Sequence, residues 1–239
     1  MSKKMTDDEL HLHLLLARNY LDEFLTDMES GTEAHKKKAQ LLGYWVSDYI
    51  NFLKREDSFL PFSIPQYKRG SVIIADFGFR IGKEFGGRHF AVVLDNDNKR
   101  SSHMITVCPL SSLKEGFSDS DISCQLPDGV YKPYYNKVAT IIQKAKSASD
   151  HAEQSENSEE KKKLAKEMDD LLQLCLKGLD EMVHMKQGSI AVTSQIMTIS
   201  KMRIVRPLRS KDLLSGIRLS EKDMDIINDR VVRRIVFAK

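Results

Sequence analysis

The sequence has few cysteines and no long apolar run, and each absence excludes a class of protein. Its three cysteines, Cys108, Cys124 and Cys175, are widely spaced and form no CxxC pair, which argues against a disulfide framework and against a zinc site. No run of about 18 apolar residues occurs, and the N-terminal segment is interrupted by acidic and histidine side chains. We therefore expect a cytoplasmic protein with no signal peptide, no membrane anchor, no metal and no cofactor.

The sequence also has little excess of charge of one sign. Lys and Arg number 37 against 34 Asp and Glu, so the net charge is only +3, far below that of a histone-like or ribosomal tail protein. The 12 Gly and 6 Pro exclude collagen-like and low-complexity chains. The basic residues are unevenly distributed, since residues 201–239 hold 11 Lys and Arg against 5 Asp and Glu. The C-terminal end is thus suited to a polyanion.

The first 60 residues are predicted to form a helical hairpin. Thr6 and Glu9 have the spacing of a capping box, apolar residues then recur every three or four positions, and Gly31 ends the pattern. A second helix is expected from about residue 32 to 54. The prolines in the segment 59–65 prevent a helix there, so that segment is either a linker or an apolar strap packed on the next unit.

From residue 67 the pattern changes to short strands. These are predicted at residues 72–77, 90–94, 104–110, 122–126, 189–192 and 196–205. Strands joined by short Gly, Asn and Asp turns indicate an antiparallel sheet or small barrel. Residues 134–186 interrupt the sheet with a predicted helical hairpin that has a charged tip, and Ser220 caps a final helix that ends near residue 236.

The glycine-rich loop 78–87 matches no nucleotide-binding motif. It is not a Walker loop, because Lys83 is followed by Glu84 and not by Ser or Thr, and a strand follows it where a dinucleotide fingerprint needs a helix. Two strand ends beside this loop do carry polar residues, with Arg88 and His89 before one strand and Ser111 after the next. If these strands are antiparallel neighbours, His89 and Ser111 lie on the same edge of the sheet.

A histidine near an arginine and a hydroxyl suits phosphodiester chemistry. The histidine exchanges protons near neutral pH, the guanidinium balances phosphate charge and the hydroxyl orients an oxygen. The alternative is that Arg88 and His89 only cap the edge of the sheet, and spacing alone leaves both interpretations open.

Three blocks of sequence, in order, resemble the MazF/PemK toxin family. Residues 69–76 with 82–94 (RGSVIIAD, then GKEFGGRHFAVVL) are similar to the opening of the family, residues 105–112 (ITVCPLSS) to its next strand, and residues 195–204 (QIMTISKMRI) to a later segment. The resemblance covers about 67–130 and 187–236. It leaves residues 1–60 and the insertion unexplained.

The resemblance implies an α+β fold, in which a small SH3-like antiparallel barrel spans residues 67–239 and carries the insertion at about 134–186. It also implies a homodimer that cuts single-stranded RNA without a metal, leaving 2′,3′-cyclic phosphate and 5′-hydroxyl ends, and that is held inactive by a cognate antitoxin.

Residue by residue, the main catalytic arginine of the family aligns with His89 and its Thr or Ser helper with Ser111. Phe90 takes the place of the proline that follows. In one interpretation His89 is the general base or acid, Arg88 stabilises the phosphorane and Glu84 is a weaker catalytic candidate. In the other, loss of the arginine leaves a non-catalytic RNA- or protein-binding module on the same fold.

The remaining site predictions concern RNA contacts and a different toxin activity. The predicted RNA-binding residues are Lys83, Ser112, Lys201, Arg203 and Arg206, although such basic residues often only solvate a surface. Gyrase-poisoning toxins that resemble CcdB share the fold superfamily and act through a C-terminal tryptophan. That activity is disfavoured, because the single tryptophan is Trp45.

Overall fold

A computed structural model describes residues 4–154, 157–185 and 188–236. The chain divides into two compact units, Met1–Asp57 and Ser58–Lys239, and each is described by itself. Among the described residues, none of the helices combines the length and the apolar character needed to cross a bilayer.

The first unit contains two helices, α1 (Asp7–Ser30) and α2 (Glu33–Arg55). The predicted capping box is confirmed, because the Glu9 amide donates to the Thr6 hydroxyl at 3.3 Å and the Thr6 amide donates to the Glu9 carboxylate at 2.7 Å. The chain leaves α1 at Gly31, as predicted. Neither helix contains a buried residue. Apolar residues of this unit, such as Leu25, Met28 and Trp45, are only partly buried.

The second unit is built on seven described strands. They are β1 (Val72–Asp76), β2 (Arg88–Val93), β3 (Met104–Ser112), β4 (Cys124–Leu126), β5 (Ser189–Ala191), β6 (Met197–Ser200) and β7 (Ile204–Arg206). Their order is β4-β5-β3-β2-β1-β7, β6 also pairs with β3, and every pair is antiparallel. The predicted α+β class is confirmed. The described strand pairs leave the sheet unclosed between β4 and β7, so the SH3-like barrel stays a prediction.

The sheet is buried on both faces because apolar residues occur at consecutive positions of its central strands. Val92 and Cys108 belong to one core, whereas their neighbours Val93 and Val107 belong to the other. This alternation follows from the period of two along a strand. Phe59, Ile64 and Tyr67 pack into the second core, which favours the apolar strap over the linker for segment 59–65.

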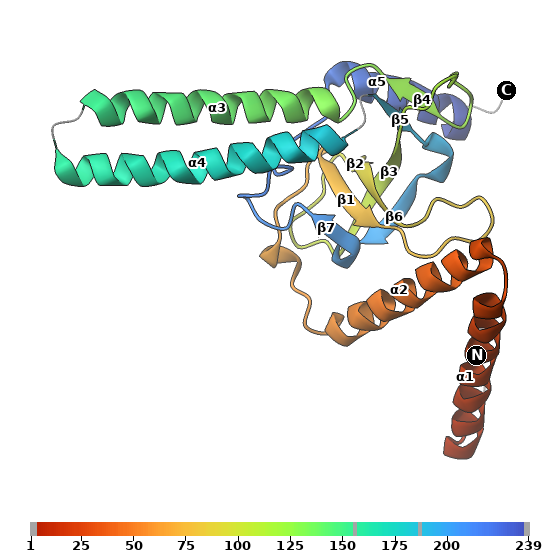
Figure 1. Ribbon diagram of the computed structural model, residues 1–239. Helices are drawn as coiled ribbons and strands as arrows, with labels where there is room; N and C mark the ends of the chain where they lie inside the picture. Colours follow the sequence, from red (N-terminus) through yellow and green to blue (C-terminus); the bar gives the residue numbers. More distant parts are fainter. Residues whose placement is uncertain (1–3, 155–156, 186–187, 237–239) are drawn as a thin grey trace. The chain divides into compact units, whose positions relative to one another are not determined.

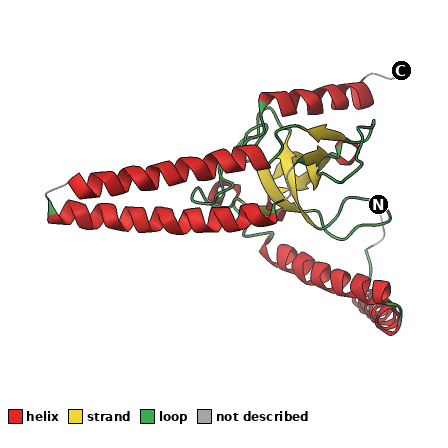
Figure 2. Ribbon diagram, turned by 45° about the horizontal axis from the view of Figure 1, so that its top comes forward, coloured by secondary structure: helices red, strands yellow, loops and turns green. Residues whose placement is uncertain are grey.

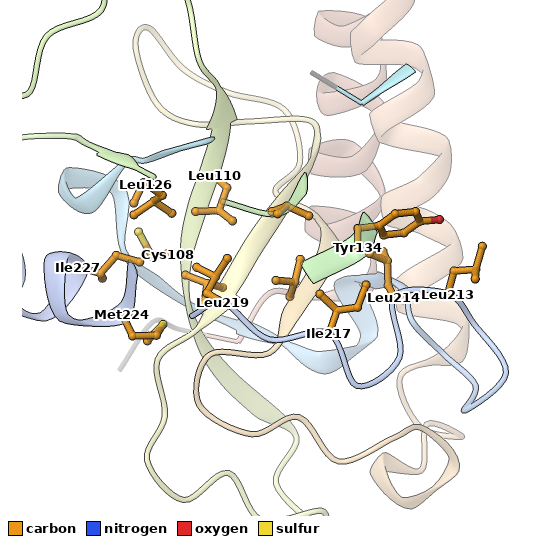
Figure 3. Close-up of a cluster of buried hydrophobic side chains, with 14 of the residues drawn as sticks. Cys108, Leu110, Leu126, Tyr134, Leu213, Leu214, Ile217, Leu219, Met224 and Ile227 are labelled. Atoms are coloured by element: carbon orange, nitrogen blue, oxygen red, sulfur yellow. The ribbon is translucent and has the colours of Figure 1, made fainter. Parts of the chain in front are cut away.

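Three helices complete the unit: α3 (Tyr131–Gln154), α4 (Ser158–His184) and α5 (Glu221–Val231). Figures 1 and 2 show α3 and α4 side by side as an antiparallel hairpin that extends away from the strands, as predicted for the insertion. Figure 3 shows Tyr134 of α3 and Met224 and Ile227 of α5 in the same core as Cys108 of β3. The Ser220 hydroxyl accepts the Asp223 amide at 3.2 Å, confirming the predicted cap of α5.

An ion-pair network fixes the hairpin to the sheet. The guanidinium of Arg206, at the end of β7, contacts Glu181 of α4 at 3.1 Å and Asp212 at 2.9 Å. The Tyr134 hydroxyl of α3 donates to the same Glu181 carboxylate at 2.5 Å. Although burial opposes it, the hydrogen bonds from Arg206 hold the pKa of Asp212 below its ordinary value. The inserted hairpin is thus joined to the strands through its base.

Candidate functional site

Strand β3 changes its partner partway along its length. Its pairing with β2 ends at Ala91↔Pro109, after which Leu110, Ser111 and Ser112 pair with β5. The first residues of β2 pair with β1 alone. If the β2–β3 register continued, His89 would lie opposite Ser111 and Arg88 opposite Ser112. The strands separate at the position where the polar residues occur.

A pocket of about 260 Å³ lies at this separation. Three parts of the fold line it: the start of β2 with its β1 neighbour, the end of β3, and the junction of α4 with β5 together with the residue before α3. The lining residues are Ile74, Arg88, His89, Phe90, Leu110, Ser111, Ser112, Val130, His184, Met185, Gly188 and Ser189. The pocket therefore combines two histidines, an arginine and three serines with an apolar floor.

The structure brings together four of the predicted site residues: Arg88, His89, Ser111 and Ser112. The expectation that β2 starts only at Phe90 is wrong, because β2 starts at Arg88 and pairs it with Asp76. Adjacent strand residues point to opposite faces. Both residues nevertheless line the pocket, which lies where β3 has separated from β2.

His89 lines the pocket and packs against an aromatic ring. Its ring centroid lies 4.6 Å from that of Phe85, whose edge in turn meets Phe77. Desolvation lowers the pKa of His89 below its ordinary value, and the positive charge of Arg80 lowers it further against the opposing effect of a hydrogen bond with the Gly86 backbone. The imidazole is therefore predominantly neutral at neutral pH, the state in which it accepts a proton.

Arg88 is held at the mouth of the pocket by a buried carboxylate. Its Nε lies 3.3 Å from Asp76 Oδ2, and the arginine side chain is 56% exposed while that of Asp76 is only 9% exposed. The Gly78 amide donates to the other Asp76 oxygen at 2.8 Å. Gly87, just before Arg88, has φ +83°, a backbone conformation that favours glycine. The guanidinium is thus positioned and still accessible to an anion.

Glu84 and Lys83 lie in the glycine-rich loop and do not line the pocket. The Glu84 carboxylate accepts the Ile81 amide at 3.1 Å, so it shapes the loop. The side chain of Gln195 also binds this loop. It donates a hydrogen bond to the Lys83 carbonyl at 3.3 Å and accepts one from the Phe85 amide at 3.4 Å. The geometry gives Glu84 a structural contact and no position from which to act in the pocket.

The three RNA-binding residues predicted near the C-terminal end make contacts within the protein. Lys201 is buried, and its ammonium donates to the Lys99 carbonyl at 3.0 Å. The prediction that Lys201 binds an RNA phosphate at the surface is therefore wrong. Arg203 donates to the Asp76 carbonyl at 3.3 Å. Arg206 is held in the ion pairs to Glu181 and Asp212 described above. The sequence of this basic segment did not reveal these partners, because Lys99, Asp76 and Glu181 come from other parts of the chain.

Sequence reasoning missed His184, Ser189 and Arg80. His184 ends α4 and Ser189 begins β5, so both come from the edge of the insertion, far in sequence from His89. The helical pattern places His184 at a helix end but gives no sign of what that end faces. Arg80 was read only as a loop residue, yet its charge acts on His89. The described residues contain no group of three or more His, Cys, Asp or Glu side chains arranged to hold a metal ion.

Comparison with known proteins identifies part of this unit. Residues 68–148, about a third of the chain, match the family model of the PemK-like, MazF-like toxin of type II toxin-antitoxin systems. A search of curated proteins gave no match. The matched range runs from β1 through β4 into α3 and includes Arg88, His89 and Ser111. The resemblance is thus confirmed over these residues, and its later segment, at 187–236, stays a prediction.

Proposed function

We propose that this protein is a toxin-like, metal-independent endoribonuclease that cleaves single-stranded RNA and leaves 2′,3′-cyclic phosphate and 5′-hydroxyl ends. One observation carries the proposal: a single pocket is lined by a histidine, an arginine and a serine that sequence reasoning had selected for this chemistry. The match of residues 68–148 to a toxin family supports it. A nucleotide-sized anion is the natural occupant of a small pocket with this lining.

In the proposed reaction His89 is the general base. Its lowered pKa leaves it neutral at neutral pH, so it can take the proton from the ribose 2′-hydroxyl as that oxygen attacks the phosphorus. Arg88 balances the charge that develops on the phosphoryl oxygens, and Ser111 orients one of them. Ser112 contributes a second hydroxyl at the same edge, and the charge of Arg80 adds to the burial that favours neutral His89.

A histidine at the position of the family's arginine changes which residue supplies charge and which exchanges a proton. An arginine supplies charge but does not lose its proton in a protein, whereas a histidine exchanges a proton near neutral pH. With Arg88 beside it, this chain retains a guanidinium while gaining a base. The substitution is therefore compatible with catalysis and not only with binding.

The test is incubation of the purified protein with mixed-sequence RNA in EDTA, followed by analysis of the fragment ends. We expect cyclic phosphate and 5′-hydroxyl ends, and a loss of about 10²–10⁴-fold in rate for His89→Ala. His151→Ala is the matched control, because this exposed histidine lies on α3 about 30 Å along the helix from its first residue. RNA that is bound but left intact by a folded protein would support the non-catalytic binding module instead.

We further propose the partners and setting that such a toxin implies: a cognate antitoxin that covers the pocket, a homodimer with SH3-like barrels, and a cytoplasmic location. Light scattering after size exclusion measures the dimer directly. Growth after induction measures toxicity, and we expect the parent to arrest growth while Arg88→Ala combined with His89→Ala does not. Equal toxicity of parent and double variant would place the harmful activity outside this pocket.

A further inference from the structure

The proposed reaction lacks one participant, a group that protonates the departing oxygen. A base alone leaves a 5′-alkoxide, which is a poor leaving group unless an acid supplies a proton. A second histidine, His184 at the end of α4, also lines the pocket. We propose that His184 is the general acid of this reaction, and this inference rests on the proposed function.

The end of α4 that carries His184 is fixed to the sheet. Three residues earlier, Glu181 makes the ion pair with Arg206 at 3.1 Å and accepts the Tyr134 hydroxyl. Met182 and Met185, on either side of His184, both pack against the main hydrophobic core. His184 itself stays exposed. An exposed side chain on an anchored helix end can meet a substrate in a reproducible position.

One hydrogen bond also decides which ring nitrogen of His184 is left for a substrate. His184 Nδ1 lies 2.9 Å from the backbone oxygen of Asp180, and a carbonyl oxygen can only accept, so Nδ1 carries a proton. Nε2 is then the nitrogen that exchanges a proton with the substrate. Burial, together with the positive charge of Arg80, favours the neutral form of His89.

The two histidines divide the proton transfers. The 2′-oxygen loses its proton to neutral His89 and forms a bond to phosphorus, while the bond from phosphorus to the 5′-oxygen breaks. The departing 5′-oxygen receives the proton from Nε2 of His184. The products are the cyclic phosphate and the 5′-hydroxyl, His89 ends protonated and His184 neutral, and exchange with water restores both.

The test compares two leaving groups at one cleavage site. Once a site is mapped with the parent protein, two oligonucleotides are made that carry it, one with the natural 5′-oxygen and one with 5′-sulfur. A thiolate leaves without a proton. We expect His184→Ala to slow cleavage of the natural linkage by about 10²–10⁴-fold and to cleave the sulfur linkage within a few-fold of the parent. His89→Ala should slow both, and His151→Ala neither.

The outcomes separate the inference from the proposed function. Cleavage by the parent with an unchanged rate for His184→Ala on the natural linkage overturns the role of His184 alone. Equal losses on both linkages make His184 a residue for binding or folding and also overturn the inference. His184→Gln, which keeps a polar side chain, should behave like the Ala variant, since it cannot carry the proton. No cleavage by the parent overturns the proposed function, and the role of His184 with it.

Discussion

The two helical hairpins of this chain are similar in helix length and differ in burial. Helices α1 and α2 have 24 and 23 residues, α3 and α4 have 24 and 27, and all four are amphipathic. None of the residues of α1 or α2 is buried, whereas five residues of α3 and two of α4 are. The inserted hairpin also brings His184 into the pocket.

The difference shows that an amphipathic pattern predicts a helix but not what its apolar face contacts. Tyr20 of α1 is 72% exposed, whereas Tyr134 of α3 is 1% exposed and bonded to Glu181. The N-terminal hairpin depends on local interactions such as its caps. The inserted hairpin depends on tertiary packing, which is the usual source of helix stability in a folded protein.

The largest difference in stability is expected between the alanine variants of Tyr134 and Tyr20. Tyr134→Ala should lower the free energy of unfolding of the second unit by about 3–5 kcal/mol, because it leaves a cavity in the core and removes the bond to Glu181. Tyr20→Ala should change stability by less than about 0.5 kcal/mol. Hydrogen exchange of strand peptides in urea measures the second unit, and fluorescence of Trp45 the first. Similar losses for both variants would contradict the contrast.

The ion pairs of the two hairpins should also differ in their contribution to the free energy of unfolding. Arg206→Met should destabilise the second unit by about 2 kcal/mol, since it leaves the half-buried Glu181 and Asp212 without their cation. The matched pair in the first unit is Lys36 with Glu33, whose side chains are 50% and 90% exposed. Lys36→Met should have no measurable effect on urea unfolding. A stable Arg206→Met protein that had lost RNA affinity would make Arg206 a binding residue after all.

Removal of a helix cap should affect the two units unequally. Thr6→Ala removes a cap worth about 1 kcal/mol from a helix without buried residues, so hydrogen exchange in the first turns of α1 should accelerate. Ser220→Ala removes the equivalent cap of α5, but the buried Met224 and Ile227 keep that helix in place. Exchange in α5 should therefore change less. The reverse order would mean that α1 is held by contacts other than its caps.

The smallest effect is expected from Arg80, whose positive charge acts on His89 of the pocket. Cleavage should fall on acidification as His89 is protonated, at a pH below the ordinary histidine pKa of about 6.5. Arg80→Gln removes a repulsive charge, so the pKa of His89 rises and the loss of activity begins at higher pH. The rate of cleavage against pH measures this, with Arg209→Gln, an exposed arginine outside the glycine-rich loop, as control. An acid limb that stays in place would show that Arg80 does not act on His89.

Much of the fold was predictable because it depends on local patterns. The Thr6 and Ser220 caps, the order of the strands along the chain and the helical insertion all follow from residues close together in sequence. Strand boundaries were less accurate, as β2 shows by starting at Arg88. That start depends on pairing with β1, which is a tertiary contact.

Part of the candidate site was predictable from the sequence. His89 and Ser111 were placed at one edge because antiparallel neighbours bring the start of one strand beside the end of the next. The contact of Lys201 with Lys99 and that of Arg206 with Glu181 were not predictable, because a basic residue in sequence does not show whether a carbonyl or a carboxylate from another segment is near.

The sequence by itself determined the caps, the periodicities and the presence of a histidine, an arginine and serines at two strand ends, since these are properties of neighbouring residues. Only the tertiary structure decided that β3 leaves β2 after Pro109, that the gap becomes a pocket, and that α4 ends there with His184. The physical reason is that strand pairing joins residues far apart in the chain, such as those of β3 and β5, which lie 77 to 81 positions apart, and the free energy of those contacts is not encoded in any short segment.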